Sequence, residues 1–367
     1  MKKYFLAIAS FFIYSHISLG QVYPGQMDST FVPVRSHHYD PELTFDFCVN
    51  EPAWSNQAGI HSAFGSTDRL YFRKEVPVNH DNDLSSSYST TVWRGERANA
   101  QILVWSSEAL EQVRVSTQDL RSAEGNIIPK DRITFELVRY VLSNYPYAEK
   151  KAICGESPYK SGFLMPDRFE TLDRFDLPSQ TTRPVWMMVD VPRGTVPGTY
   201  KGQVEVRAKG KAPQLLNLEI VVQNQLLPYP KDWKYRLDLW QNPWAVAWYN
   251  HVEPWSPEHK MLLKQHLKHY ADAGGTYITT YGVHSPWSDN SYMIEGGMIE
   301  WIKKADGTWA FDYKIFDEYV ELAMECGIDE AITLYTPIPW GFRHRYKDEA
   351  TGDYSYINWA PSSEEFK

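Results

Sequence analysis

Cysteine is scarce in this sequence of 367 residues, which has three, at Cys48, Cys154 and Cys326. An odd number of thiols cannot all pair within one chain. A disulfide between Cys48 and Cys154 stays an open alternative, whereas Cys326 follows the apolar face of a predicted helix and is expected to be a buried free thiol. No C-x-x-C or H-E-x-x-H spacing occurs. His259, His266 and His269 recur near helical spacing, but no carboxylate or cysteine completes a metal site with them, so they are expected to lie on a solvated helix face. The sequence therefore predicts neither a metal site nor a cofactor.

Positive charge is also in short supply. Lysine and arginine number 37 against 46 aspartates and glutamates, which gives a net charge of -9 and an isoelectric point of about 5.7. Binding to backbone phosphates needs a basic surface, so nucleic acid is excluded as a partner. The G-x-S-x-G, P-loop and dinucleotide-binding motifs are missing from the sequence as well. Their absence gives no support to serine-hydrolase or nucleotide-dependent chemistry.

Long apolar runs are missing except at the amino terminus. Lys2 and Lys3 precede an apolar run over residues 4–14, and Ser18-Leu19-Gly20 then offers small residues, Ser18 and Gly20, at the cleavage positions. This pattern predicts a signal peptide over residues 1–20 with cleavage near Gly20-Gln21. The run is too short to span a bilayer, and no integral membrane segment is expected elsewhere. The mature protein is therefore expected to be secreted or periplasmic.

Aromatic residues, by contrast, are abundant, at 15% of the chain with 14 tryptophans and 24 tyrosines. Residues 21–230 alternate in the manner of short β-strands separated by turn residues. Strands are predicted over residues 185–191 and 200–208, with a turn at Pro197-Gly198 between them. Such spacing is typical of an all-β sandwich of the immunoglobulin-like or jelly-roll type.

From residue 231 onward, predicted strands alternate with predicted helices. Strands are expected over residues 234–242, 276–284 and 331–338, and helices from a cap at Ser256 to Gly274 and from a cap at Asp312 to Gly327. This order implies parallel strands joined by crossover helices, as at the start of a TIM (β/α)₈ barrel. A complete barrel needs about 250 residues. Residues 231–367 are therefore expected to be the amino-terminal portion of an incomplete barrel.

The last residues of the sequence also bear on whether the barrel is complete. Ser362 and Glu365 have the spacing of a capping box, which predicts that a helix opens there. The alternative is a disordered tail. With a helix opening at the last residues, we expect the sequence to be the front part of a longer protein.

Aromatic and polar residues gather where the three predicted strands of residues 231–367 end. Because parallel strands present their carboxyl ends at one face, these residues are expected to form a shared cup. Rings cover the apolar faces of a sugar, and polar groups satisfy its hydroxyls. The alternative is that each tryptophan simply packs a loop. The candidate substrate-binding residues are Trp240, Asn242, Trp244, Tyr281, His284, Trp287, Tyr335 and Trp340.

Several long motifs resemble those of glycoside hydrolase family 123. They are "DLWQNPWAVAWYNHVEPWSPEH", "HYADAGGTYITTYGVHSPW" and the run from "MIEWIKKADGTW" to "FRHRYKDEATGDY" in the second half, with "WRGERANAQILVW" and "VDVPRGTVPGTYKGQVEV" upstream. The resemblance covers nearly all of the mature chain. It implies a β-sandwich followed by a catalytic (β/α)₈ barrel.

The resemblance also implies an activity, that of a retaining β-N-acetylgalactosaminidase in which the substrate's own acetamido oxygen attacks the anomeric carbon. An adjacent Asp-Glu pair after a later barrel strand serves this chemistry. Asp329-Glu330 is a tempting match, but it precedes a strand and so belongs to the opposite face of the barrel. No catalytic residue is therefore assigned within this chain, which is expected to be inactive alone.

Two other functions remain open. The chain is alternatively a non-catalytic carbohydrate-binding protein, or a structural module built on the sandwich. For the glycosidase and for the carbohydrate-binding protein, the partner is a glycan. The sequence leaves the exact sugar, its linkage and the oligomeric state undecided.

Overall fold

The computed structural model describes residues 27–28, 31–33, 42–43, 51–77, 84–143, 163–283, 297–335, 338 and 342–366. The expected signal peptide, Cys48 and Cys154 lie outside these ranges. The chain forms two compact units, Met1–Leu227 and Pro228–Lys367. Among the helices that are described, none combines the length and the apolar character needed to cross a membrane.

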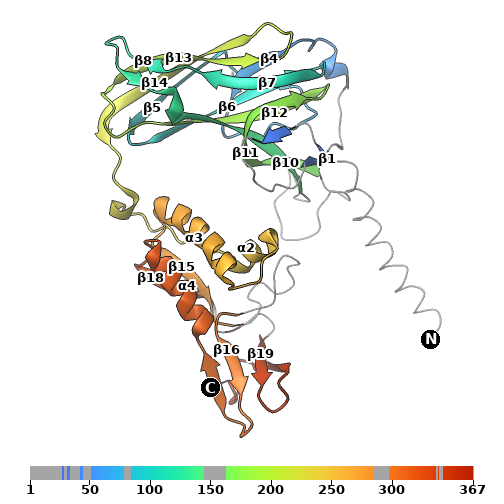
Figure 1. The fold of residues 1–367 in the computed structure, drawn as a ribbon, viewed down its shortest axis with the longest axis vertical. Coiled ribbons are helices and arrows are strands. Elements are labelled where there is room, and N and C mark those ends of the chain that lie inside the picture. Colours follow the sequence, from blue (N-terminus) through green and yellow to red (C-terminus); the bar gives the residue numbers. More distant parts are fainter. Residues whose placement is uncertain are drawn as a thin grey trace, which may run out of the picture. The chain divides into compact units, whose positions relative to one another are not determined.

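The first unit consists of β-strands arranged in two layers (Figure 1). One hydrogen-bonded path runs in the order β4-β6-β12-β10-β11-β7-β13-β14-β5. The first part of the long strand β11 pairs with β10 and its end pairs with β7, so this strand connects the two layers. The strands are β4 (His61–Gly65), β5 (Ser87–Arg94), β6 (Arg97–Ser106), β7 (Leu110–Thr117), β10 (Ile133–Ser143), β11 (Phe163–Leu177), β12 (Thr181–Asp190), β13 (Gly198–Arg207) and β14 (Gln214–Leu226).

Short elements complete this unit. They are β1 (Met27–Asp28), β2 (Phe31–Pro33), β3 (Glu42–Leu43), β8 (Leu120–Arg121), β9 (Ile127–Ile128) and the 3₁₀ turns Glu51–Trp54 and Lys130–Arg132. The predicted strands over residues 185–191 and 200–208 are confirmed as β12 and β13.

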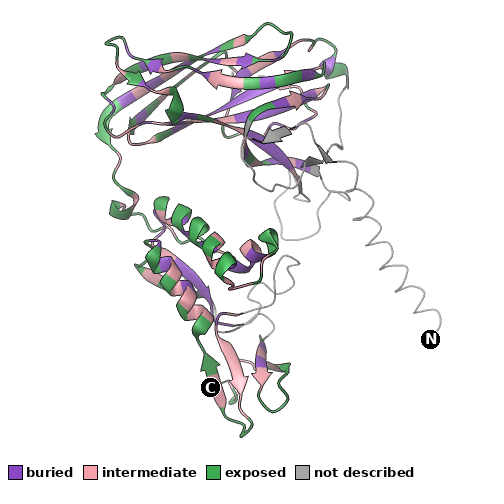
Figure 2. Cartoon of the chain, in the orientation of Figure 1, coloured by how far each residue is buried: buried purple, intermediate pink, exposed green. Residues whose placement is uncertain are grey.

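The core of the first unit lies between its two layers and follows from the alternation of the strands. On β13, Tyr200, Val204 and Val206 are buried, while Lys201 and Arg207 are exposed. Burying one such apolar side chain stabilises the fold by about 1.5–3 kcal/mol. The alternation that predicts strands in the sequence thus also determines which face of each strand enters the core (Figure 2).

The second unit is built around two parallel strands and three helices. Strands β15 (Tyr277–Tyr281) and β18 (Ala331–Tyr335) pair in parallel, with Tyr281 opposite Tyr335. The helices are α2 (Pro243–Asn250), α3 (Pro257–Asp272) and α4 (Lys314–Glu325), and a 3₁₀ turn, Pro230–Asp232, precedes them. The start of α3 is confirmed, because the Ser256 hydroxyl accepts a hydrogen bond from the His259 N–H at 3.2 Å.

The prediction of a regular strand over residues 234–242 is wrong. This segment makes a single parallel bridge, between Leu237 and Gly275. Side chains hold it in place instead of a backbone ladder. The Asp238 carboxylate accepts from the hydroxyl of Thr279 on β15 at 3.1 Å and from the hydroxyl of Thr333 on β18 at 2.9 Å. The segment therefore still runs beside β15, although it does not form a regular strand.

A four-stranded sheet in the second unit was not predicted at all. Its order is β17-β16-β19-β20. Two of these strands follow β15 and two follow β18, so the connections after two neighbouring strands join in one sheet. The strands are β16 (Glu300–Lys303), β17 (Trp309–Asp312), β19 (Arg343–Asp348) and β20 (Tyr354–Asn358).

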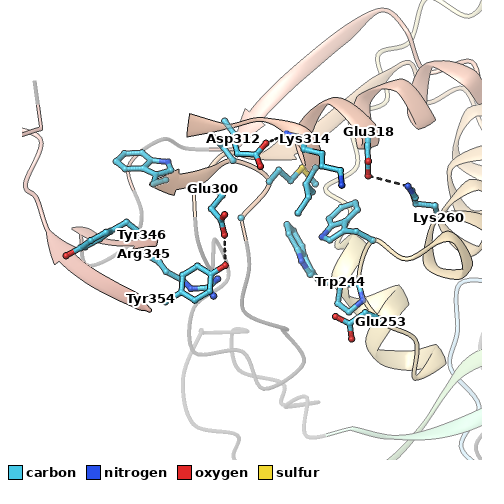
Figure 3. Close-up of a pocket in the computed structure, with 17 residues that line it drawn as sticks. Trp244, Glu253, Lys260, Glu300, Asp312, Lys314, Glu318, Arg345, Tyr346 and Tyr354 are labelled. Atoms are coloured by element: carbon cyan, nitrogen blue, oxygen red, sulfur yellow. Dashed lines mark hydrogen bonds and ion pairs between the residues drawn. The ribbon is translucent and has the colours of Figure 1, made fainter. Parts of the chain in front are cut away.

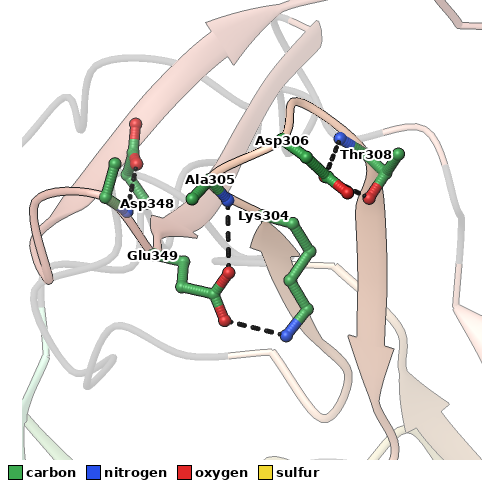
Figure 4. Close-up of polar contacts among 7 residues, drawn as sticks. Lys304, Ala305, Asp306, Thr308, Asp348 and Glu349 are labelled. Atoms are coloured by element: carbon green, nitrogen blue, oxygen red, sulfur yellow. Dashed lines mark hydrogen bonds and ion pairs between the residues drawn. The ribbon is translucent and has the colours of Figure 1, made fainter.

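The two hairpins of this sheet meet through few backbone pairs. Strands β16 and β19 pair in parallel over only two positions. The turns reinforce the junction, because the Glu349 carboxylate accepts hydrogen bonds from Lys304 Nζ at 2.9 Å and from the Ala305 N–H at 3.2 Å (Figure 4). A charged side chain thus ties the second hairpin to the turn of the first.

Three smaller predictions can be compared with the structure. Helix α4 begins after Tyr313, and Asp312 accepts from the Lys314 N–H at 2.9 Å without being the cap residue itself. Cys326 is confirmed as a buried free thiol. The helix expected to open at Ser362 stays a prediction, because the described residues 361–366 form turns. There Ser363 accepts from the Phe366 N–H at 3.3 Å.

Replacing Asp238 with alanine is expected to destabilise the second unit. Thr279 is fully buried, so the change leaves its hydroxyl without the carboxylate acceptor and removes the contact to Thr333. We expect a loss of about 1–2 kcal/mol in the free energy of unfolding, since Asp238 itself is exposed. The measurement is chemical unfolding followed by tryptophan fluorescence. Asp329→Ala, at an exposed carboxylate, is the matched control, and equal losses in the two variants would contradict the prediction.

Candidate functional site

Five aromatic rings form a continuous row at the carboxyl ends of the parallel segments. Ring centroids lie 4.9 Å apart for Trp240 and Tyr335, 5.9 Å for Tyr335 and Tyr281, 5.8 Å for Tyr281 and Trp244, and 5.5 Å for Trp244 and Trp255. We call this set the aromatic row. The structure therefore brings together four of the residues that the sequence placed in a sugar-binding cup.

The aromatic row is exposed at its Trp240 end, buried in its middle and partly exposed at its Trp255 end. Trp240 is 57% exposed and Tyr335 is half-buried, whereas Tyr281 is fully buried and Trp244 is only 2% exposed. The open end presents an indole at the surface. Trp244 and Tyr281 act mainly as its packed base, which is the alternative role that the sequence left open for these rings.

The residues that join Trp240 to Trp244 are held by hydrogen bonds. Asn242, a candidate binding residue, caps helix α2, and its side-chain oxygen accepts from the Ala245 N–H at 3.2 Å. The Gln241 carbonyl accepts from the Tyr281 hydroxyl, and its side-chain oxygen accepts from the Tyr319 hydroxyl at 3.0 Å. Burial raises the pKa of Tyr319 far above that of a free phenol, so this hydroxyl remains a donor at neutral pH. The turn after Trp240 is therefore firmly positioned.

The remaining candidate binding residues, His284, Trp287 and Trp340, lie outside the described residues. Their expected place in the cup stays a prediction.

A cavity of about 530 Å³ adjoins the end of the aromatic row that is formed by Trp244 and Trp255 (Figure 3). Trp244 and Trp255 line one side, and Glu300 with Trp301 on β16 lines another. Lys260 and Glu318 reach it from the amino-terminal turns of α3 and α4. Because those helices follow the parallel segments, the cavity lies toward the same carboxyl ends as the row.

The charged groups around the cavity largely offset one another. Lys260 Nζ lies 3.3 Å from a Glu318 carboxylate oxygen. The Tyr354 hydroxyl donates to Glu300, and this hydrogen bond is the main reason why the pKa of Tyr354 is raised. The Arg345 guanidinium lies 3.6 Å from the centroid of the Tyr354 ring, which is cation–π geometry. The cavity thus has polar walls with no excess of positive charge, because four carboxylates and three cations line it: Glu253, Glu300, Asp312 and Glu318, and Lys260, Lys314 and Arg345.

The cavity residues on β19 and β20 were missed from the sequence, although a signal exists. Arg343 stacks on Tyr356 at 3.7 Å and Arg345 stacks on Tyr354 at 3.6 Å. The sequence shows this as Arg-x-Arg and Tyr-x-Tyr on either side of a turn-forming stretch. Two alternating pairs of this kind indicate a hairpin with its rings and cations on one face.

Asp329-Glu330 lies away from this region, as the sequence led us to expect. Glu330 directly precedes β18 and accepts from the hydroxyls of Thr276 at 2.8 Å and Tyr277 at 3.2 Å. These contacts tie the amino ends of β15 and β18 together. Across the described part of the chain, no group of three or more His, Cys, Asp or Glu side chains is placed to hold a metal ion.

The burial of His259 differs from the prediction made from the sequence. We expected His259, His266 and His269 to share a solvated helix face, but His259 is fully buried while the other two are exposed. Its Nδ1 accepts from the Trp255 N–H at 2.8 Å, and its Nε2 lies 2.8 Å from the Pro243 carbonyl oxygen. The neutral ring that donates from Nε2 satisfies both contacts. Because His259 lies in the first turn of α3, its ring packs against Pro243 at the start of α2.

Two family models match the chain. The model for the glycoside hydrolase 123 catalytic domain matches residues 240–367, and the model for the glycoside hydrolase 123 N-terminal domain matches residues 64–208. Together these matches cover well over half of the sequence. No curated protein matches the chain.

A solved structure shares the fold of this chain. A family 123 glycoside hydrolase from Clostridium perfringens, studied for glycolipid glycan hydrolysis, has a TM-score of 0.73 and 24% identity. The match covers 84% of this chain and 53% of that one, so the chain spans about half of that protein's length. A PapD-like domain of human CEP192 matches with a TM-score of 0.24 and 12% identity over 50% of this chain and 99% of that one. A similarity that low carries no argument.

Acidification is expected to destabilise the second unit through His259. Burial lowers the pKa of His259 in the folded state, so its neutral form contributes stability above the ordinary pKa of about 6.5. That contribution is lost as the pH falls below this value, at most about 1.4 kcal/mol per pH unit. The measurement is the unfolding free energy between pH 7.5 and pH 5.

His259→Gln should flatten this pH dependence, whereas Gln265→Ala, at an exposed residue on the same helix, should leave it unchanged. Burial also lowers the pKa values of His266 and His344, so some dependence should remain in the His259 variant. Identical slopes in the wild type and His259→Gln would refute the assignment.

Proposed function

Because this chain belongs to glycoside hydrolase family 123, we propose that it binds glycans ending in a β-linked N-acetylhexosamine, with N-acetylgalactosamine preferred. The observation that carries the proposal is Trp240, exposed at the end of the aromatic row and packed edge-to-face against Tyr335. An indole face held this way offers the apolar surface on which a pyranose ring stacks. The buried rings below it keep that face in a fixed orientation.

The reaction we propose for this family member is retaining hydrolysis with substrate assistance. The acetamido oxygen of the substrate attacks the anomeric carbon, one carboxylate orients the acetamido group, and a second acts as general acid and then base. No described carboxylate lies beside Trp240 in a pair suited to those roles. We therefore propose that residues 1–367 supply sugar binding and that the proton-transferring pair is not among them.

The fold supports the site's place in a larger architecture. The segment around Leu237 and strands β15 and β18 run parallel in chain order, and α3 and α4 cross between them. This is how a (β/α)₈ barrel begins. We propose that residues 231–367 form its first part, that residues 21–230 form the sandwich, and that a signal peptide over residues 1–20 directs the protein to the periplasm or outside the cell.

Replacing Trp240 with alanine is expected to weaken the binding of methyl N-acetyl-β-D-galactosaminide about five- to tenfold, because a stacking surface worth about 1 kcal/mol is lost. Trp248→Ala, at an indole exposed to 47% on helix α2, is the matched control and should bind as the wild type does. Isothermal titration calorimetry measures both. Unchanged affinity in the Trp240 variant would remove the basis of the proposal.

The polypeptide of residues 1–367 is expected to bind the sugar without cleaving it. The measurement is release of 4-nitrophenol from its N-acetyl-β-D-galactosaminide, alongside binding of the non-hydrolysable methyl glycoside. Binding without release is the expected result. Release at a rate that scales with protein concentration would show that the catalytic pair lies within these residues.

A further inference from the structure

We propose that an open strand edge in the first unit binds an extended segment of a partner protein, which adds to β7 as a further strand. The edge is the side of β7 that faces away from β13, over residues 114–117. It borders a cavity of about 550 Å³ that is lined by residues of the first unit alone. This inference is independent of the glycan-binding proposal.

The edge is open because β11 changes its pairing partner. The pairing of β7 with β11 ends where Val113 lies opposite Phe175. If β11 continued beside β7, Thr171 would lie opposite Thr117. Thr171 lies instead opposite Glu136 of β10, in the other layer. Among the described strands, β7 beyond Val113 therefore has β13 as its only partner.

The residues that line the cavity show that it runs along this edge. Residues 114–118 all line it, although successive side chains of a strand point to opposite faces. Such a consecutive set borders one cavity only along the edge of the strand. On the other side, β10 contributes Ile133, which is buried, and Phe135, which is half-buried against the core. The cavity is thus a groove with a strand edge on one side and an apolar surface on the other.

A strand edge of this kind matches the backbone of a peptide. Every second residue of an extended chain directs its N–H and C=O toward the same edge, so an added strand supplies both donors and acceptors in register. A side chain of the added strand that points between the layers reaches Phe135. We therefore expect the bound segment to carry apolar residues at alternate positions.

The charges around the groove favour an uncharged segment. Arg114 lies 2.9 Å from an oxygen of the Asp173 carboxylate. The other charged residues that line the cavity are Lys130 and its neighbour Asp131. Two cations and two carboxylates leave no excess of either sign to attract a charged ligand.

Residues 114–117 also lack the features that commonly protect an open edge. Soluble proteins block such edges with proline, with lysine or with other charged side chains. This stretch is Arg-Val-Ser-Thr, and its only charge is already paired with Asp173. Its four residues span about 13 Å, so a segment of about five residues is long enough to cover it.

The experiment uses three peptides and titration calorimetry on the full chain. The parent is acetyl-Thr-Val-Ser-Val-Thr-amide. One derivative carries N-methyl groups on both valine nitrogens, and the other carries them on the serine nitrogen and the last threonine nitrogen. We expect the parent to bind in the micromolar range. Because alternate N–H groups point to opposite edges of a strand, one derivative should bind at least about tenfold more weakly while the other keeps its affinity.

A conservative variant locates the binding in the groove. Val115→Thr keeps a β-branched side chain and places a hydroxyl where an apolar contact is expected, so it should weaken binding about threefold to fivefold. Val196→Thr, at an exposed valine outside the groove, is the matched control and should bind as the wild type does. Thermal unfolding of both variants shows whether they remain folded.

Several outcomes would overturn the proposal. They are no binding of the parent peptide, equal effects of the two methylation patterns, or an unchanged affinity in a folded Val115→Thr variant. A chain that sediments as a dimer and is dissociated by the peptide would assign the edge to a second copy instead. Displacement of the peptide by methyl N-acetyl-β-D-galactosaminide would assign the groove to a glycan.

Discussion

The carboxylate of Asp238 is the constraint on which the candidate site depends. It accepts hydrogen bonds from Thr279 on one strand and Thr333 on the next, while its own segment makes only one backbone bridge. This contact sets three consecutive parallel segments in register. Gln241, Tyr281 and Tyr335 then arrive at the same edge because each follows its segment by a similar distance. A side-chain contact therefore does what a backbone ladder does elsewhere in the fold, and the aromatic row follows from it.

The connections after β15 and β18 are also held together by specific contacts. Loops between strands and helices are commonly separate and variable, and they carry binding residues on a rigid scaffold. Here the two connections contribute strands to one sheet, joined by the β16–β19 pairing and the Glu349 contacts. The wall formed by Glu300, Trp301 and Arg345 thus has the order of a sheet. A site built on paired strands holds its side chains more accurately than one built on free loops.

Much of this fold is visible in the sequence, and the failures have a common cause. Local patterns correctly predicted β12, β13 and the start of α3, because alternation and a Ser-Pro cap need only neighbouring residues. The strand expected over residues 234–242 failed because its partner contacts come from Asp238 and Tyr270 side chains. The four-stranded sheet was missed because its central pairing joins segments about 45 residues apart. His259 was misplaced because helical spacing cannot show which helix packs against a given face.

The same limit explains the mixed result for the proposed cup. The sequence does not distinguish Trp240 from Trp244, yet Trp240 is exposed and Trp244 is part of the core. Several carboxylates of the second unit have structural roles. Asp238, Glu318 and Glu330 accept hydrogen bonds from structural partners, as does Glu300 at the cavity. A general acid must hold its own proton ready to donate to the leaving group. Acceptors committed to holding the fold do not meet that need, which is why we assign proton transfer to none of these carboxylates.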